Sequence, residues 1–193
     1  MAVEFLKKAA KTAATGEDDT RRIVADMLRD MESGGEARAR HYAQELDKWS
    51  GDIIVPDDAI AAAADRVSGQ LKDDIQFSLE RVRTFARAQL RSQTEFETEL
   101  SEGLVAGQRL IPVTTAGCYV PGGRYAHVAS AVMSVTTAKV AGVENVVACS
   151  PPHDELGVHP AILYTMHLAG ADTILTLGGV QGIAALAFGL FTD

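Results

Sequence analysis

The chain has 193 residues, enough for one domain with a sizeable core, and its 47% hydrophobic content is that of an ordinary globular protein. Its formal net charge of −8 at pH 7 argues against nonspecific binding to nucleic acid or to an anionic membrane, because both require a basic surface. No window is apolar over the length needed to cross a bilayer and the N-terminus has no long apolar segment, so we expect a cytoplasmic protein.

Charged residues are concentrated in the first half of the chain. Residues 1–100 hold 35 Lys, Arg, Asp and Glu, whereas residues 101–193 hold nine. This distribution is typical of solvent-exposed helices followed by a buried α/β core. We therefore predict a helical arm (1–93), a hairpin connection (94–116) and a partial Rossmann-like NAD-binding domain (117–193).

Apolar residues at three-to-four spacing predict several helices in the arm. The longest has a stripe through Ile75 and Leu79 that continues to Phe85 or Ala86. The first predicted helix covers 2–14, and the second is capped by Asp18, Asp19 or Thr20 and ends at Gly34-Gly35. A third helix has the apolar stripe Ala39, Tyr42, Leu46 and Trp49, and a brief extended segment follows at Ile53-Ile54-Val55. The last two predicted helices run from Pro56-Asp57 through Val67 and over about 70–91.

The period of the pattern changes to two between Thr94 and Val113. Such alternation predicts a hairpin, with its turn at 105–108, that links the arm to the core.

The second half alternates strands with helices. Predicted strands cover 117–120, 145–150 and 173–177, and predicted helices cover 127–141, a segment that starts at Pro160 and ends at Gly170, and 180–190. This order implies right-handed crossovers and a parallel sheet, so the fold class is α/β with an incomplete Rossmann-like sheet after the helical arm and hairpin. The turns after Val120, Ser150 and Leu177 then line one edge of that sheet.

Two of these turns contain paired glycines, Gly122-Gly123 after Pro121 and Gly178-Gly179. Glycine allows a sharp turn at the carboxyl end of a strand, and we expect the backbone N–H groups there to face a ligand. No Gly-x-Gly-x-x-Gly fingerprint and no Walker A lysine motif is present. A single such turn is more often ordinary turn chemistry than a phosphate site, and two at one edge, each opening a helix, narrow those odds.

Several other polar residues are candidates for a functional role, and each has a structural interpretation beside the functional one. Arg124 follows the first turn and either binds an anionic group or is a surface arginine. His127 is expected to bond the backbone at a helix start. Cys118 and Cys149 lie in apolar strands and are interpreted as buried thiols of a reducing compartment, with a nucleophile as the lesser alternative. The five histidines show no i, i+4 pair, and we predict no metal site within this chain.

An ordered set of motifs over about 112–190 resembles the histidinol dehydrogenase family. The segments are Gly117-Cys-Tyr-Val-Pro-Gly-Gly123, Thr137-Ala-Lys-Val-Ala-Gly-Val-Glu-Asn-Val-Val147 followed by Ser150-Pro-Pro152, His167-Leu-Ala-Gly-Ala-Asp172, and Leu177-Gly-Gly-Val-Gln-Gly-Ile-Ala-Ala-Leu-Ala-Phe-Gly189.

The resemblance implies an NAD-linked, zinc-requiring enzyme that oxidises a primary alcohol through an aldehyde to a carboxylate and works as an intertwined homodimer. It places NAD contacts on Tyr119 and Gln181, both at the predicted ligand edge. The segment Arg124-Tyr-Ala-His-Val-Ala-Ser130 departs from the usual histidinol dehydrogenase pattern and looks more like the sulfopropanediol dehydrogenase branch. The implied substrate is sulfopropanediol, with Arg124 near its sulfonate, or else L-histidinol.

The family's zinc ligands, its Glu-His acid–base pair and a further NAD-contacting asparagine have no counterpart before Asp193. The apolar face of Ile183, Leu186 and Ala187 would also lie on a small sheet of three strands, whereas a parallel sheet needs cover on both faces. We therefore expect the N-terminal part of a longer enzyme, inactive alone because it lacks the metal and the base. The alternatives are a non-catalytic truncated remnant that binds a nucleotide or a partner, and a nucleotide-binding fold for another substrate.

Overall fold

The computed structural model describes residues 17–122, 125–155 and 157–192, so the expected helix 2–14 lies outside the described residues. Three helices come first: α1 (Glu17–Leu46), α2 (Asp57–Asp65) and α3 (Gly69–Arg91). The expected cap residues of the second helix lie inside α1, which is already helical at Glu17. The expectation that Trp49 continues the third helix is wrong, because the helix ends at Leu46 and Lys48 has a positive φ of 57°.

The predicted break at Gly34-Gly35 is confirmed as a kink inside α1. Gly35 has φ 58° and ψ −144°, a backbone conformation that other residues rarely adopt. Asp30 accepts hydrogen bonds from Arg38 Nε (2.6 Å) and from the Tyr42 hydroxyl (2.8 Å) across the kink. The hydrogen bond from Arg38 is the main cause that lowers the pKa of Asp30, and both contacts join the two halves of α1.

Helix α3 confirms the predicted stripe and resolves its ambiguous position. Ile75, Leu79 and Ala86 are buried, whereas Phe85 is 66% exposed. Ser68 caps the helix by accepting a hydrogen bond from Leu71 N at 3.3 Å.

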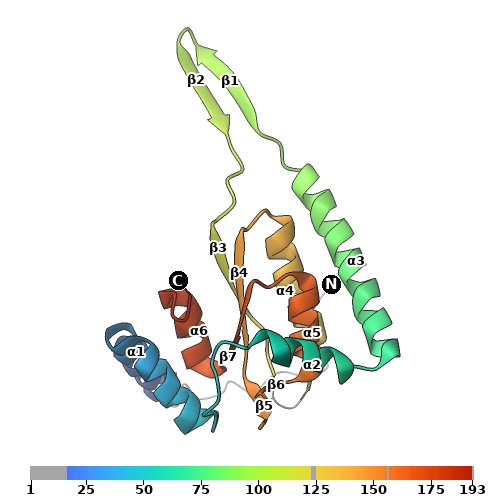
Figure 1. The fold of residues 1–193 in the computed structure, drawn as a ribbon. Coiled ribbons are helices and arrows are strands. Elements are labelled where there is room, and N and C mark those ends of the chain that lie inside the picture. Colours follow the sequence, from blue (N-terminus) through green and yellow to red (C-terminus); the bar gives the residue numbers. More distant parts are fainter. Residues whose placement is uncertain (1–16, 123–124, 156, 193) are drawn as a thin grey trace, which may run out of the picture.

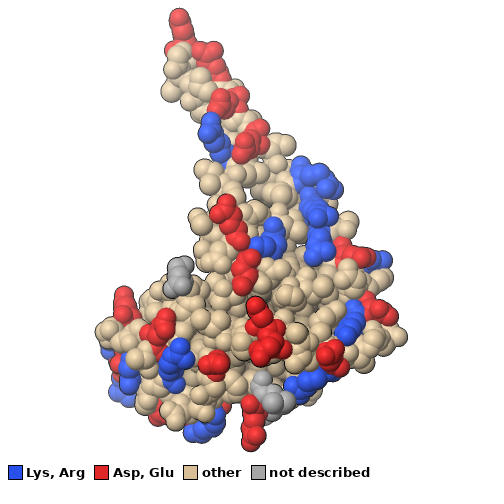
Figure 2. Space-filling model, in the orientation of Figure 1, with Lys and Arg blue, Asp and Glu red and all other residues tan. Residues whose placement is uncertain are grey.

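The hairpin is present, but its turn is not where the sequence predicts it. Strands β1 (Phe96–Ser101) and β2 (Leu104–Gln108) are antiparallel, and the chain reverses at Gly103, which has φ 78°. The predicted turn at 105–108 is wrong because that segment is strand β2. Figure 1 shows the hairpin projecting away from the rest of the molecule, and Figure 2 shows acidic side chains along it.

Three parallel strands form the predicted sheet. They are β3 (Thr115–Tyr119), β4 (Asn145–Ser150) and β7 (Thr173–Thr176), in the order β3-β4-β7. The crossover helices α4 (Val128–Val140) and α5 (Pro160–Ala169), and the helix α6 (Gly179–Phe188) that follows β7, lie close to their predicted positions. Gly170 ends α5 in the left-handed conformation, as the proline-first and glycine-last pattern predicts.

Both faces of the sheet are covered (Figure 1). Helices α4 and α5 pack on the face that carries Val146 and Ala148, with α3 against α4 and α2 against α5. Helix α6 packs on the face that carries Val147 and Cys149, with α1 against it. The expectation of a poorly covered sheet is therefore partly wrong, because α1 packs against α6. Ile183 on α6 remains 50% exposed.

The edge of the sheet beside β7 is also extended by the short piece predicted at 53–55. Ile54 forms an antiparallel bridge with Leu175, and Thr176 N donates to Ile53 O at 2.7 Å. A small antiparallel pair, β5 (Pro152–Asp154) and β6 (Gly157–Val158), follows β4 and has no counterpart in the sequence prediction. Among the described helices, none combines the length and apolar character needed to cross a membrane.

Candidate functional site

The turns that follow the three parallel strands meet at one edge of the sheet. Pro151 lies between the two glycine turns: a Cβ added to Gly122 would stand 2.9 Å from Pro151 Cγ, and one added to Gly178 would stand 2.5 Å from Pro151 Cβ. Both positions require glycine because the turns approach this proline so closely. The structure therefore brings Gly122 and the Gly178-Gly179 turn together, as the parallel sheet predicts. Gly123 and Arg124 lie outside the described residues.

Tyr119 joins the end of β3 to the second glycine turn. Its hydroxyl accepts a hydrogen bond from Gly179 N at 3.2 Å, and the side chain is half-buried. Burial raises the pKa of Tyr119, against a smaller opposite effect of the Gly179 N–H. Tyr119 therefore presents a neutral phenol at the edge of the sheet.

Gln181 lies in the first turn of α6, directly after the paired glycines. Its side chain is 1% exposed, and Nε2 donates to Asp47 Oδ2 at 2.8 Å. Oε1 is buried and has no hydrogen-bond partner among the residues that the structure describes. A Cβ on Gly179 would meet this oxygen at 3.3 Å, so Oε1 lies directly beneath the exposed Gly179. A buried acceptor without a partner is unusual and fits a position that a ligand donor completes.

Ser150 supplies a second buried acceptor at the same edge. Its side chain is 0% exposed, and within the described chain its Oγ has no hydrogen-bond partner. The oxygen lies 3.1 Å from where a Cβ on Gly122 would be. Two such oxygens, on Ser150 and Gln181, thus lie beside the two glycine turns.

The expectation that the N–H groups of the second turn face a ligand is wrong. Gly178 N donates to Asp47 Oδ2 at 3.2 Å, and Gly179 N donates to Tyr119. Sequence reasoning missed Asp47, because it lies 131 positions from Gly178 in the sequence. One signal was available: Asp47 follows the last residue of α1, where a negative charge opposes the helix dipole and therefore needs another reason to be there.

The two thiols are buried, as predicted. Burial raises the pKa of Cys118, and it raises the pKa of Cys149 to about 12. Because only the thiolate is a nucleophile, neither cysteine is activated for catalysis near neutral pH.

The prediction for His127 is wrong, and another histidine makes the contact that was expected of it. His127 precedes α4 but makes no capping hydrogen bond with its side chain in the described structure, so the expected backbone contact is wrong. That role belongs to His159, whose Nδ1 accepts from Ala161 N at 3.2 Å at the start of α5. Across the described residues, no group of three or more His, Cys, Asp or Glu side chains could hold a metal ion.

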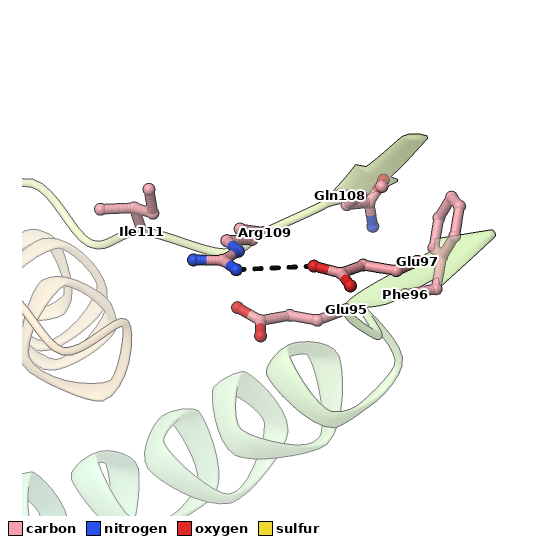
Figure 3. A pocket seen from close by; sticks show the side chains of 7 residues that line it. Glu95, Phe96, Glu97, Gln108, Arg109 and Ile111 are labelled. Atoms are coloured by element: carbon pink, nitrogen blue, oxygen red, sulfur yellow. Dashed lines mark hydrogen bonds and ion pairs between the residues drawn. The ribbon is translucent and has the colours of Figure 1, made fainter. Parts of the chain in front are cut away.

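A hollow of about 890 Å³ lies at the base of the hairpin and is lined by residues other than those of the sheet edge. Figure 3 shows Arg109 and Glu97 facing one another across it, 3.5 Å apart, with Glu95 beside them. Glu95 already has a partner within the protein, because its Oε1 accepts a hydrogen bond from Leu110 N at 2.9 Å. This hollow is open to solvent and contains none of the candidate ligand contacts, so the sheet edge is the better candidate site.

Comparisons with known proteins identify the family of this chain. A model of the family "Histidinol dehydrogenase" matches residues 10–192. A histidinol dehydrogenase homolog from Pelagibacter ubique is 56% identical over 100% of this chain and 45% of its own length. Sulfopropanediol 3-dehydrogenase from Ruegeria pomeroyi is 50% identical over 99% of this chain and 44% of its own length. The chain therefore spans less than half the length of these curated relatives.

A solved structure also matches. The crystal structure of histidinol dehydrogenase from Elizabethkingia anophelis superposes with a TM-score of 0.84 and 30% identity, covering 96% of this chain and 42% of that one. The match extends over the helices and the sheet alike, so the fold is Rossmann-like α/β. This chain belongs to the histidinol dehydrogenase family, whose members are dehydrogenases that act on alcohols.

Proposed function

We propose that this chain is the N-terminal part of an NAD-dependent, zinc-requiring alcohol dehydrogenase that oxidises a small polar primary alcohol to a carboxylate in the cytoplasm. The observation that carries the proposal is the meeting of Tyr119 and Gln181 at one sheet edge, where the Gly178-Gly179 turn contacts both. The buried and unpartnered Gln181 Oε1 fits a cofactor that brings a hydrogen-bond donor.

We propose that the described residues bind the cofactor and that the residues for the chemical steps lie in another part of the protein. When bound, NAD accepts the hydride and zinc polarises the alcohol oxygen. Tyr119 provides a neutral phenol and ring surface, and Gln181 provides an acceptor. We place the zinc ligands and the acid–base pair in a further part of the protein, so the chain alone is expected to lack turnover. Gly122 and Gly123 would form the neighbouring turn.

The proposed substrate is sulfopropanediol, oxidised to sulfolactate, with L-histidinol as the second candidate. The relative named sulfopropanediol 3-dehydrogenase is 50% identical, whereas the histidinol dehydrogenase of Methanosarcina barkeri is 36% identical, which supports the first. Arg124 stays the proposed contact for the sulfonate. Assays of both alcohols with the polypeptide encoded past Asp193, with zinc and NAD supplied, test this: oxidation of neither would contradict the proposed activity.

Gln181→Ala is expected to weaken NAD binding by roughly tenfold or more, because one buried acceptor and its contact to Asp47 are both lost. The measurement is a calorimetric titration of the 193-residue chain with NAD. Gln70→Ala is the matched control, since Gln70 is an exposed glutamine on α3 and should leave the affinity unchanged.

Two outcomes of this titration count against a dehydrogenase origin of the site. Equal NAD affinity in wild type and Gln181→Ala would remove Gln181 from the cofactor site. Complete lack of saturable NAD binding, with self-association retained, would favour the alternative of a remnant that binds a partner.

We further propose that the protein assembles as a homodimer and that the hairpin belongs to the interface. Every residue of β1 and β2 is exposed, and an isolated two-stranded hairpin is marginally stable in water. Several apolar side chains of the hairpin and of the segment that follows it are more than half exposed, which is typical of a surface that binds a protein. They are Phe96, Leu100, Leu104, Val105, Ile111 and Val113.

Leu100→Lys is expected to raise the dimer dissociation constant at least roughly tenfold, because it puts a charge where the interface requires an apolar side chain. Sedimentation equilibrium measures the constant. Glu102→Lys, at the tip of the same hairpin, changes the net charge by two units rather than one without removing an apolar side chain, and serves as the control. A wild-type chain that stays monomeric at high concentration would contradict the proposed interface.

A further inference from the structure

Asp47 receives two hydrogen bonds from the start of α6. Its Oδ2 accepts from the backbone N of Gly178, which is the N-cap residue of that helix, at 3.2 Å. The same oxygen accepts from Gln181 Nε2 at 2.8 Å. Asp47 itself comes from the end of α1, so a distant segment of the chain places a half-buried carboxylate at this helix terminus.

The position of this carboxylate is the one that an anionic ligand usually takes. Free N–H groups and the helix dipole make a helix N-terminus attractive to phosphate, and α/β folds commonly bind the pyrophosphate of a dinucleotide there. In this chain Gly178 N and Gly179 N already have acceptors, and the local charge is negative. A pyrophosphate at the start of α6 would meet a like charge, and the N–H groups of Gly178 and Gly179 would not be free to bind it.

Asp47 also determines which end of the Gln181 carboxamide faces the turn. A carboxylate only accepts hydrogen bonds, so the NH₂ group of Gln181 must point at Asp47. The amide is planar, so this contact directs Oε1 away from Asp47, and it lies beneath Gly179 without a partner among the described residues. The contact with Asp47 thus leaves a buried acceptor without a partner next to the edge, and that acceptor suits a neutral donor.

We propose that Asp47 is a positioning residue that takes the place of the ligand phosphate at α6 and orients Gln181 Oε1 toward a neutral hydrogen-bond donor of the ligand. The identity of the ligand rests on the proposed function. If the ligand is NAD, the donor is the amide of the nicotinamide or a ribose hydroxyl. The phosphates lie away from α6. The exclusion of anions from α6 follows from the contacts of Asp47 alone.

The first experiment tests the exclusion without NAD. The 193-residue chain and its Asp47→Ala variant are titrated with inorganic pyrophosphate, and the backbone amide signals of Gly178 and Gly179 are followed by NMR. Wild type should show no saturable shift at these amides, and Asp47→Ala should show one with at least roughly tenfold tighter binding. Wild-type amides that bind pyrophosphate as tightly as those of the variant would overturn the proposal.

Two further variants keep the test decisive. Asp47→Asn removes the charge but keeps an acceptor for Gly178 N, so it should retain the fold if Asp47→Ala does not, and it should also gain pyrophosphate binding. Asp52→Ala removes the same charge from an exposed residue close by in sequence. It should behave like wild type, and a gain equal to that of Asp47→Asn would overturn the proposal in favour of a general effect of net charge.

The second experiment tests the donor and uses NAD. Asp47→Ala should weaken NAD binding roughly tenfold, whereas Asp52→Ala should not. Nicotinic acid adenine dinucleotide, in which a carboxylate replaces the amide, should bind more weakly than NAD if the amide is the donor, and equally if the donor is a ribose hydroxyl. Unchanged NAD affinity in Asp47→Ala would overturn the orienting role. A wild type that binds no NAD would overturn the proposed function and the donor assignment with it, while the pyrophosphate titration still decides the exclusion.

Discussion

Leu175→Ala is expected to lower the free energy of unfolding by about 2–5 kcal/mol, the range for removing a fully buried leucine. Leu175 lies in β7 with 0% exposure and belongs to the cluster formed with Met31 and Ala43 of α1. The alanine leaves a cavity between the sheet and α1 that both are too closely packed to fill. Urea unfolding followed by circular dichroism measures the change.

Ile23→Ala is the control for this substitution. Ile23 is a 57% exposed apolar residue on α1, and its loss should change stability by no more than about 0.5 kcal/mol. A loss below about 1 kcal/mol for Leu175→Ala would mean that α1 is not packed on the sheet as described.

Gly178→Ala is expected to cost about 1–3 kcal/mol and to disturb the candidate site. The added methyl group would stand 2.5 Å from Pro151 Cβ and 3.2 Å from Pro151 Cα, which is backbone and cannot rotate away. Either the turn or Pro151 must shift, and the shift pulls Gly178 N from Asp47. Thermal unfolding measures the stability, and the NAD titration measures the effect on the site.

Gly69→Ala controls for the general effect of adding a methyl group to glycine. A Cβ on Gly69 meets nothing within 4 Å, and the residue begins α3, where alanine is at least as favourable as glycine. Stability should stay the same or rise slightly. If Gly178→Ala were equally harmless, the close approach of the glycine turn to Pro151 would be wrong.

Sequence patterns predicted the elements of the second half well because each has a local boundary signal. Pro160 and Gly170 delimit α5, and apolar runs delimit β4 and β7. The hairpin turn was misplaced because glycine occurs at both 103 and 107, and spacing does not tell which has the positive φ. In the structure Gly107 lies in β2, where a Cβ would meet Phe96 O at 2.5 Å. Glycine is needed there for space rather than for a turn.

The candidate site was predicted only in the parts that are continuous in sequence. Tyr119 and Gln181 lie at the same edge, as predicted, because parallel strands bring their carboxyl ends together. Asp47 and the occupied N–H groups were missed because they depend on how α1 docks against α6. The docking of two helices depends on the way in which many side chains fit together, and a local sequence pattern does not predict that fit.

Asp47 and Gly178 are 131 positions apart in the sequence, and this separation determines when the site can form during folding. Contacts between such distant segments require closure of a long loop, so this carboxylate should reach α6 only after the sheet and its crossover helices have assembled. The reverse motion is undocking of α1, which would disable the edge while the parallel strands stay paired. A ligand that binds only the assembled edge should therefore slow amide hydrogen exchange along α1, far from its own contacts.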